Sequence, residues 1–440
     1  MMAPLRVGLA GLGTVGSAVV KMLVQSREQL TERAGRPIEL TAYASKDPPK
    51  DKSIDLAKAR KVDDPVALAT DPGIDVFVEL MGGDDDPAKR AVEAALGAGR
   101  PVVTANKALI ARHGNALARL AEKKSASFAF EASVGGGIPI VKTLREGLGG
   151  ARISRVYGIL NGTCNFILTK MQRERRPFAD CLKDAQRLGY AEADPTFDIG
   201  GFDTAHKIAI LTSLAFGTEI NVDAVHVEGI ETITLADLQA ADDLGYKVKL
   251  LGVASRTDAG IEQRVHPTMV PKHSTIGGVD GVLNAVAIDS DMMDLTLVGP
   301  GAGGPATSSA VVADLVDLAR GRLSPPLGRP AGQLAKSTQA PIQRHEGGYY
   351  IRLAALDRPG TMATISRAMA AENISLESIV QRHENARPHG GDDPKSAAAP
   401  ASVVLITYAT NEDAVRRALA AIEREGVVAE RPQLIRIEKS

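Results

Sequence analysis

An acidic stretch that ends on a lysine is the part of this sequence with the clearest chemical potential. Residues 185–207 read AQRLGYAEADPTFDIGGFDTAHK, and their carboxylates include Glu192, Asp198 and Asp203. The apolar run that follows predicts a helix, on which Asp203 and Lys207 lie four residues apart and share one face. A lysine beside a carboxylate suits a small ligand that carries an amine and needs a proton. A solvated acidic loop with a surface ion pair explains the stretch equally well.

The helix that must position this lysine begins inside the same stretch. We expect Asp203 or Thr204 to cap it by accepting from its free backbone N–H groups. His206 lies on another face of the helix, so we expect it to be structural. Asp194 precedes a proline and is expected to shape the turn.

A glycine-rich turn near the start of the chain predicts a nucleotide site. The apolar run Leu5–Ala10 leads into GLGTVG, and a helical pattern follows. In the dinucleotide-binding fingerprint the glycines permit a tight turn, close approach of backbone to pyrophosphate, and close packing of helix on strand. The helix N-terminus then supplies N–H donors. The expected cofactor contacts are Gly11, Gly13, Thr14, Val15 and Gly16; a purely structural turn is the alternative.

The end of the next strand, Ile38–Ala44, bears on the choice of cofactor. An acidic residue near this position binds the ribose hydroxyls in NAD-specific sites. Here Ser45 and Lys46 follow the strand, and a hydroxyl with an ammonium suits a 2′-phosphate better. We therefore expect NADP rather than NAD, although Asp47 lies close and Lys46 could simply be solvated.

Strands alternate with helices up to residue 131, which predicts a parallel, doubly wound sheet. One strand ends in Thr104-Ala105-Asn106-Lys107, near the expected nicotinamide. Thr104 is a candidate cofactor contact, and Lys107 a candidate for cofactor, substrate or proton work, with a surface lysine as the alternative. A second glycine loop at 299–304 opens a helix and could return to close the nucleotide site through Gly303.

Three consecutive glycines, residues 135–137, follow a strand that ends at Glu131. Such a loop permits sharp turns and exposes backbone carbonyl oxygens. It could therefore bind a monovalent cation, with Glu131 nearby, or serve as a hinge between domains.

The fold expected is α/β, in several domains. A Rossmann-type parallel sheet occupies residues 1–140 and is completed by about 299–325, and an α+β catalytic and dimerisation domain occupies 141–298. A Pro-, Gly- and Ser-rich linker covers 326–347. Residues 348–440 show the order βαββαβ, which predicts a small ferredoxin-like module.

Composition limits the other possibilities. A net charge of −1 gives no sequence-wide electrostatic footprint for nucleic acid or an anionic membrane. Two cysteines, Cys164 and Cys181, fit a reducing cytoplasm better than a disulfide scaffold. The first strand starts almost at once, leaving no room for a signal peptide, and no apolar run is long enough to span a bilayer. We expect a cytoplasmic protein without nucleic-acid or membrane partners.

Together these motifs resemble homoserine dehydrogenase over essentially the whole chain. The resemblance rests on GLGTVG, TANK, EASVGGGIPI, LNGTCNFIL and, most specifically, GYAEADPTFDIGGFDTAHK. The tail, with LDRPG and ENISLESI, is similar to an ACT domain, a module that usually binds amino acids. With no aspartate-kinase region, the chain resembles the monofunctional form.

This resemblance implies NAD(P)-dependent interconversion of L-aspartate 4-semialdehyde and L-homoserine, a step in threonine, methionine and isoleucine biosynthesis. It implies that Lys207 and Lys107 are the active-site lysines, and that the carboxylates organising substrate and lysine are Glu192, Asp198 and Asp203. The family's sodium site would match backbone carbonyls near Glu131, Val134, Gly136 and Ile138. A homodimer or homotetramer is expected, with feedback by threonine through the tail.

Two alternatives remain open from the residues themselves. Another semialdehyde oxidoreductase that makes an acyl phosphate would need Cys164 as a nucleophile, whereas free cysteines are more often packing residues. A catalytically inactive amino-acid sensor would keep the tail and the nucleotide fold, although the intact acidic loop and both lysines speak against it. The tail could also serve only to assemble oligomers.

Overall fold

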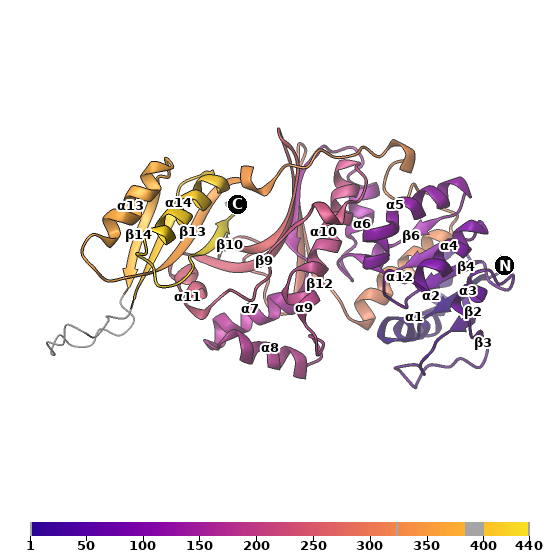
Figure 1. Ribbon diagram of the computed structural model, residues 1–440. Helices are drawn as coiled ribbons and strands as arrows, with labels where there is room; N and C mark the ends of the chain where they lie inside the picture. The colour runs from indigo at the N-terminus through magenta and orange to yellow at the C-terminus, as the bar shows by residue number, and fades with distance from the viewer. Residues whose placement is uncertain (1, 323, 383–399, 439–440) are drawn as a thin grey trace.

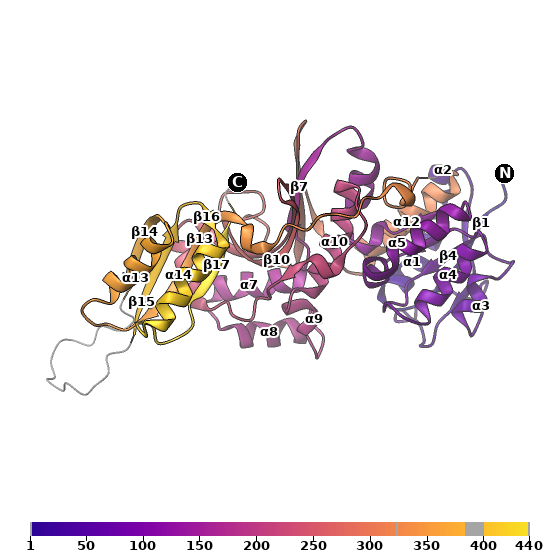
Figure 2. The ribbon, with the colours of Figure 1, turned by 45° about the horizontal axis from the view of Figure 1, so that its top comes forward.

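The computed structural model describes residues 2–322, 324–382 and 400–438, which form three bodies in a row (Figure 1). An N-terminal α/β domain lies at one end and a C-terminal module at the other. Between them stands a large sheet with helices on one side, and the view in Figure 2 shows the same sequence of bodies. Among the described residues, no helix is both long and apolar enough to cross a membrane.

The N-terminal domain contains the parallel, doubly wound sheet that the alternating pattern predicts. Its strand order is β3-β2-β1-β4-β5-β6, and every pairing is parallel. The strands are β1 (Leu5–Ala10), β2 (Ile38–Ala44), β3 (Arg60–Lys61), β4 (Val76–Glu79), β5 (Val102–Thr104) and β6 (Phe128–Ala129). Strand β4 is buried along its whole length, as expected where helices cover both faces of a parallel sheet.

The helices of this domain come from two distant parts of the chain. The N-terminal part supplies α1 (Thr14–Gln25), α2 (Arg27–Ala34), α3 (Pro65–Ala69), α4 (Ala88–Gly97) and α5 (Lys107–Lys123). Helix α12 (Gly304–Ala319) returns after the central domain and packs against α1, with Val311 and Leu315 in the same apolar core as Val19 and Leu23. The segment after residue 299 therefore completes the domain.

The central domain is a mixed sheet with helices packed on it. Its strands run in the order β12-β11-β7-β9-β10, with antiparallel neighbours. They are β7 (Ile153–Ile159), β9 (Tyr246–Thr257), β10 (Gly260–Pro271), β11 (Leu283–Ser290) and β12 (Asp294–Pro300); short β8 (His226–Val227) pairs with β10. The helices are α7 (Gly162–Glu174), α8 (Phe178–Arg187), α9 (Thr196–Ile199), α10 (Phe202–Phe216) and α11 (Leu235–Asp243).

Helix α10 lies between the central sheet and the N-terminal domain (Figure 1). It packs on β9 and β10 on one side and on α5 on the other, so almost all of its side chains are buried. A helix buried all round would ordinarily be apolar throughout. Asp203, His206 and Lys207 are the charged or titratable exceptions, and each is less than 9% exposed.

The start of α10 corrects one expectation. Gly201, not Asp203 or Thr204, occupies the N-cap position, and no side chain caps this helix. The capping prediction was wrong because the helix starts two residues earlier and the Asp203 carboxylate turns towards side chains of other elements. The expected common face of Asp203 and Lys207 is present.

The C-terminal module has the predicted βαββαβ order. Its elements are β13 (Glu346–Ala355), α13 (Thr361–Ala371), β14 (Leu376–Arg382), β15 (Ala401–Thr407), α14 (Glu412–Arg424) and β17 (Gln433–Ile437). They form the sheet β17-β13-β15-β14. Strand β17 also pairs in parallel with β10, at Thr268↔Arg436 and Met269↔Ile437. Module and central domain therefore share one 11-stranded sheet, which the sequence did not predict.

The segment predicted as a linker lies in contact with both the N-terminal domain, at α5, and the central domain. Leu327 and Ala331 are each 1% exposed. Ala335 bridges to Thr218, and Gln339 bridges to Ile261 at the start of β10. The connection between the second and third bodies is thus held to the surface it crosses.

Candidate active site

A pocket of about 750 Å³ lies where the N-terminal and central domains meet. Its walls come from the start of α5, the start of α7, the loop after α8, helices α9 and α10, and the glycine loop before α12. The five residues expected to carry the chemistry all line it: Lys107, Glu192, Asp198, Asp203 and Lys207.

Asp203 is the centre of this group. It is 2% exposed, and its carboxylate lies between two lysines: Lys207 Nζ is 2.7 Å from Oδ2, and Lys107 Nζ is 2.9 Å from Oδ1. Asn161 Nδ2 also donates to Oδ2 at 2.8 Å. Burial alone would raise the pKa of Asp203, but the two ammonium groups outweigh it and hold the pKa below its usual range. Asp203 therefore stays ionised and fixes both lysines.

Lys207 is the more deeply buried lysine. Besides Asp203, its Nζ donates to the backbone oxygen of Leu160 at 2.7 Å. A lysine ammonium has three donors, so one remains for a ligand in the pocket. Burial lowers the pKa of Lys207, and the positive charge of Lys107 lowers it further, against the attraction of Asp203. Lys207 is therefore suited to exchange a proton.

Lys107 differs from Lys207 in its electrostatics. It is the first residue of α5, at the carboxyl end of β5, and 37% of its side chain is exposed. The charge of Asp203 raises the pKa of Lys107, against the opposing effect of burial, and Asp198 and Glu192 add to the increase. Lys107 is therefore a lasting positive charge that can polarise a ligand oxygen.

Asn161 ties the carboxylates together. Its amide nitrogen donates to Asp198 Oδ1 as well as to Asp203, both at 2.8 Å, and its oxygen caps α7 by accepting from the Cys164 N–H. Burial raises the pKa of Asp198, and the neighbouring charge of Asp203 raises it further. Glu192 stands exposed at the mouth of the pocket. These acceptors can hold the ammonium group of a small ligand.

The glycine turn has the geometry of a pyrophosphate site. A Cβ on Gly16 would lie 1.9 Å from the oxygen of Gly11, so the helix can approach the strand this closely only with glycine there. At Gly13, no other group lies within 4 Å of the place where a Cβ would stand, which leaves the backbone accessible. Gly13 is also the N-cap of α1, and no side chain satisfies the N–H groups that follow, including those of Thr14 and Val15.

The remaining expected cofactor contacts lie in different settings. Lys46 is exposed beyond the end of β2, where the Ser45 hydroxyl donates to the backbone oxygen of Asp47 at 2.7 Å. Thr104 is fully buried, and its hydroxyl donates to Glu79 at 2.6 Å. Gly303 lines the pocket at the start of α12.

The glycine loop before α6 (Ile140–Lys142) packs against the loop before α12. A Cβ on Gly136 would lie 2.5 Å from the oxygen of Gly301. The Glu131 carboxylate accepts from the N–H groups of Val141 and Lys142, at 3.0 and 2.8 Å, so it is engaged at the start of α6. Val134 and Ile138 are buried. Within the described part of the chain, no group of three His, Cys, Asp or Glu side chains could hold a metal ion.

Cys164 and His206 lie beside the site without the properties of catalytic groups. The Cys164 thiol is fully buried and donates to the backbone oxygen of Asp198 at 3.2 Å. Burial raises the pKa of this thiol well above its usual range, which disfavours the nucleophilic thiolate. Burial lowers the pKa of His206, and its ring stacks edge-on against Phe197 at 5.3 Å.

Sequence reasoning missed Asn284. This residue of β11 lines the pocket, is 1% exposed, and has no hydrogen-bond partner for either amide atom among the described residues. Its side chain packs directly against Gly301: a Cβ on Gly301 would lie 2.0 Å from the amide carbon of Asn284. Asparagine is uncommon inside a strand, and that was the only available signal.

Comparison with known proteins agrees with this geometry. A family model described as homoserine dehydrogenase matches residues 139–316, and one described as homoserine dehydrogenase, NAD binding domain, matches residues 11–131. The chain is 44% identical to homoserine dehydrogenase of Neisseria gonorrhoeae, over 99% of both chains. It is also 44% identical to that of Pseudomonas aeruginosa, over 97% of both.

Solved structures give the same answer. The crystal structure of a homoserine dehydrogenase from Thiobacillus denitrificans matches with a TM-score of 0.91 at 42% identity, covering 100% of this chain and 99% of that one. A hyperthermophilic archaeal homoserine dehydrogenase in complex with NADPH matches with a TM-score of 0.61 at 26% identity, covering 72% of this chain and 97% of that one. With its NAD(P)-binding domain and its mixed-sheet domain, this chain belongs to the homoserine dehydrogenase family and is an oxidoreductase.

Proposed function

We propose that this chain interconverts L-homoserine and L-aspartate 4-semialdehyde with a nicotinamide cofactor, and that NADP serves better than NAD. The observation that carries the proposal is the Lys107–Asp203–Lys207 arrangement inside the pocket between the two domains. It presents two lysines to the same ligand oxygen: Lys107, whose raised pKa keeps it charged, and Lys207, whose pKa is lowered.

Each pocket residue has a separate role in this reaction. Glu192 and Asp198 hold the substrate ammonium, and Lys107 stabilises negative charge on the substrate oxygen. In the oxidative direction, neutral Lys207 takes the proton of the homoserine hydroxyl; in the reductive direction, charged Lys207 returns it to the aldehyde oxygen. Bound nicotinamide supplies the hydride acceptor or donor. Asp203 and Leu160 keep the Lys207 amine aimed at the reacting oxygen.

The cofactor fits the first domain. Open space beside Gly13 and unsatisfied N–H groups at the start of α1 support a pyrophosphate there. Ser45 and Lys46 at the end of β2 favour a 2′-phosphate, and one archaeal relative is known in complex with NADPH. We assign Thr104 to support of the strand end rather than to direct contact, because its hydroxyl is engaged with Glu79.

We also propose a sodium site at the loop after Glu131. Backbone carbonyl oxygens of Glu131, Val134, Gly136 and Ile138 would bind the cation. The support is the sharp turn of this loop and its burial between two domains, where a carbonyl oxygen benefits from a cation partner.

The C-terminal module is proposed to be an ACT domain that binds threonine and inhibits the enzyme. Its βαββαβ order and its shared sheet with the central domain support this role. A homodimer or homotetramer is proposed as well, because strand β12 is an edge strand with exposed apolar side chains in and beside it: Val282, Leu283, Met292, Met293 and Val298.

A steady-state assay on homoserine tests the function directly. Reduced cofactor is followed by absorbance with NADP and NAD in parallel, each with and without threonine. We expect oxidation of homoserine, a higher kcat/KM with NADP, and inhibition by threonine. No reduction of either cofactor would contradict the proposed activity, equal or better use of NAD would contradict the preference, and an unchanged rate with threonine would contradict the regulation.

The full chain is the right material for this assay. Asp237 is fully buried in the central domain, and its carboxylate accepts from Tyr350 at 3.2 Å and from Arg352 at 2.6 Å, both residues of β13. Truncation near Leu327 would remove both partners and uncover apolar side chains of the central domain that share a core with the module, such as Met269, which is destabilising. If the shortened protein lost activity, the loss could come from unfolding and would not test regulation by threonine.

A further inference from the structure

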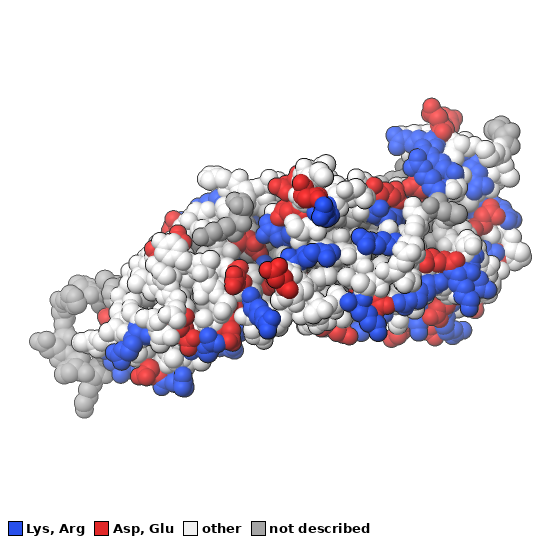
Figure 3. Space-filling view, turned by 90° about the horizontal axis from the view of Figure 1, so that it is seen from above, with Lys and Arg blue, Asp and Glu red and all other residues white. Residues whose placement is uncertain are grey.

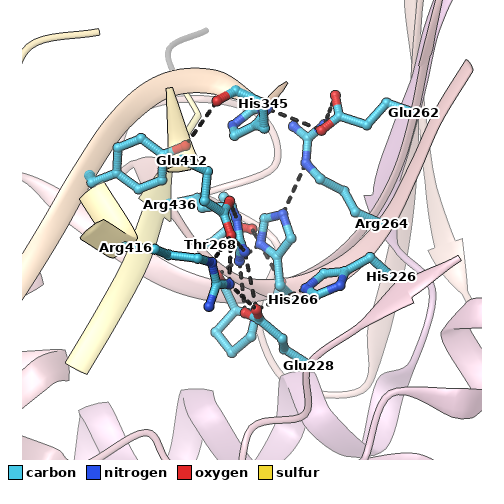
Figure 4. A network of polar contacts seen from close by, with 12 residues as sticks. His226, Glu228, Glu262, Arg264, His266, Thr268, His345, Glu412, Arg416 and Arg436 are labelled. Atoms are coloured by element: carbon cyan, nitrogen blue, oxygen red, sulfur yellow. Dashed lines mark hydrogen bonds and ion pairs between the residues drawn. The ribbon is translucent and has the colours of Figure 1, made fainter. Parts of the chain in front are cut away.

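A cluster of charged side chains joins the C-terminal module to the central domain (Figure 4). Glu228, just after β8, faces Arg436 of β17 and Arg416 of α14, while Glu412 lies on the other side of both arginines. Arg436 is 1% exposed and donates to Glu228 at 2.7 and 3.1 Å, and to Glu412 at 2.6 Å with two of its nitrogens. Arg416 reaches Glu228 at 3.4 Å.

The contacts of Glu228 cross between two bodies of the molecule. Among the described residues of its own domain, the Glu228 carboxylate has one hydrogen-bond partner, the Nε2 of His226 at 2.8 Å. Burial would raise the pKa of Glu228, but the hydrogen bonds from His226 and Arg436 outweigh it and hold the pKa well below the usual range. The carboxylate is therefore charged, and the two arginines of the module fix its position.

The backbone around Glu228 contacts the turn between α9 and α10. Its own N–H donates to the oxygen of Val265 in β10 at 2.7 Å, and the N–H of Ile230 donates to the oxygen of Ile199 at 2.9 Å. Gly229 lies so close to this turn that a Cβ there would be 2.4 Å from the Ile199 oxygen and 2.8 Å from the Cα of Gly200.

The turn at 199–201 sits between two pocket carboxylates. Asp198 immediately precedes Ile199, and Asp203 is the second residue of α10, which begins after Gly201. A shift of residues 228–230 therefore moves the backbone that carries both carboxylates. Small displacements of such groups are costly to catalysis, since an error of 1 Å can reduce the rate by about 100-fold.

We propose that Glu228 is a positioning residue: fastened to the C-terminal module by Arg436 and Arg416, it holds the 199–201 turn, and through it Asp198 and Asp203, in place for the substrate. The inference rests on the proposed function for the identity of the substrate. It makes the module part of the active-site support, and any ligand that shifts β17 or α14 would act on substrate binding through this contact.

The test compares three variants of the full chain: Glu228→Gln, Arg416→Gln and Arg417→Gln. Arg417 is the matched control, because it follows Arg416 in α14, is similarly exposed and also pairs with a carboxylate four residues earlier, yet contacts only the module. For Glu228→Gln and Arg416→Gln we expect kcat/KM for homoserine to fall by about 2- to 30-fold. The dissociation constant of NADPH, measured by fluorescence, should not change, and Arg417→Gln should match the unchanged protein.

Two further readouts separate positioning from general weakening. The double variant of Glu228→Gln and Arg416→Gln should lose no more than Glu228→Gln alone, because the contact of Arg416 with the central domain is the one to Glu228, which Glu228→Gln already removes. Hydrogen exchange should become faster in peptides covering residues 199–205 and 228–230, with no change in the N-terminal domain.

Normal homoserine kinetics in Glu228→Gln, or an equal loss in Arg417→Gln, would overturn the proposal, as would a parallel loss of NADPH affinity. If the unchanged protein fails to oxidise homoserine, the proposed function itself is wrong; the exchange rates of residues 199–205 then still decide whether Glu228 holds the turn.

Discussion

Replacing Lys207 by alanine separates proton transfer from binding. The substitution removes the Nζ that contacts Leu160 and Asp203, but Asp203 keeps Asn161 and Lys107 as partners. The carboxylate is therefore not left buried and unpaired, which would be the destabilising outcome. We expect the variant to fold and to bind cofactor, because Lys207 lies in the central domain.

The size of the loss follows from the role assigned to the amine. General acid–base catalysis contributes about 10²- to 10⁴-fold in rate, which corresponds to about 2.7–5.4 kcal/mol of activation free energy. Since Lys107 remains and still polarises the oxygen, the loss should show mainly in kcat.

The assay is homoserine oxidation across a range of pH. Burial lowers the pKa of Lys207, so the neutral amine required for oxidation forms at lower pH than it would for a free lysine. The kcat of the unchanged protein should rise with pH and level off above this lowered pKa, and the rise should vanish in Lys207→Ala. Lys247→Ala is the control, because this partly buried lysine pairs with Asp280 outside the pocket.

A kcat for Lys207→Ala within about threefold of the unchanged protein would refute the reasoning, since it lies far below the smallest loss expected for acid–base catalysis. An alkaline rise that persists in the variant would equally show that another group takes the proton.

Three further predictions concern residues around the site. Cys164→Ser should retain activity within about threefold, because the buried thiol packs in the apolar core and its hydrogen bond goes to a backbone oxygen; loss of all turnover would revive the nucleophile hypothesis. Burial and the charge of Asp314 raise the pKa of Glu131 from 4.5 to about 7, so between these values the folded state binds more protons than the unfolded state, and the free energy of unfolding falls as pH rises through them. Chemical denaturation should show a fall that is smaller by about 3 kcal/mol in Glu131→Gln than in the unchanged protein. The same pH dependence of the unfolding free energy in both proteins would contradict this. Lys46→Glu should raise the KM for NADP at least about tenfold and leave that for NAD nearly unchanged, and equal effects on both would exclude a contact with the 2′-phosphate.

Local pattern was enough for the features that depend on neighbours in sequence. Residues 11–16 lie between a strand and a helix, and their glycine spacing alone indicates the turn. The four-residue separation of Asp203 and Lys207 placed both on one face of a helix before any tertiary contact was known. Lys107 follows a strand of a parallel sheet, and the carboxyl ends of such strands form the ligand crevice.

Tertiary competition explains what the sequence did not show. Asp203 has the residue type of a helix cap, yet two lysines and Asn161 are stronger partners for its carboxylate than backbone N–H groups. Nothing near Glu228 distinguishes it from other surface acids, because its partners Arg416 and Arg436 are about 190 and 210 residues away. The pairing of β10 with β17 is equally invisible to a reading of local periodicity.

Both kinds of charge are spread over the outer surface. On the face drawn in Figure 3, acidic and basic side chains of the described residues are interspersed over the middle of the molecule. This mixture accords with the formal net charge of −1, and the charged groups in the pocket and at the contact of Figure 4 are likewise paired with groups of opposite sign.

The shared sheet has a consequence for how the chain is made. The outer edge of β10 is covered by three short pieces in turn: Gln339 at Ile261, β8 at Arg264 and Val265, and β17 at Thr268 and Met269. Strand β17 leaves the ribosome after every other strand of this sheet. During synthesis the last part of β10 is therefore an open, apolar edge, of the kind that pairs with other chains. Slow translation of the segment between β10 and β17 should favour aggregation of the nascent protein over correct closure.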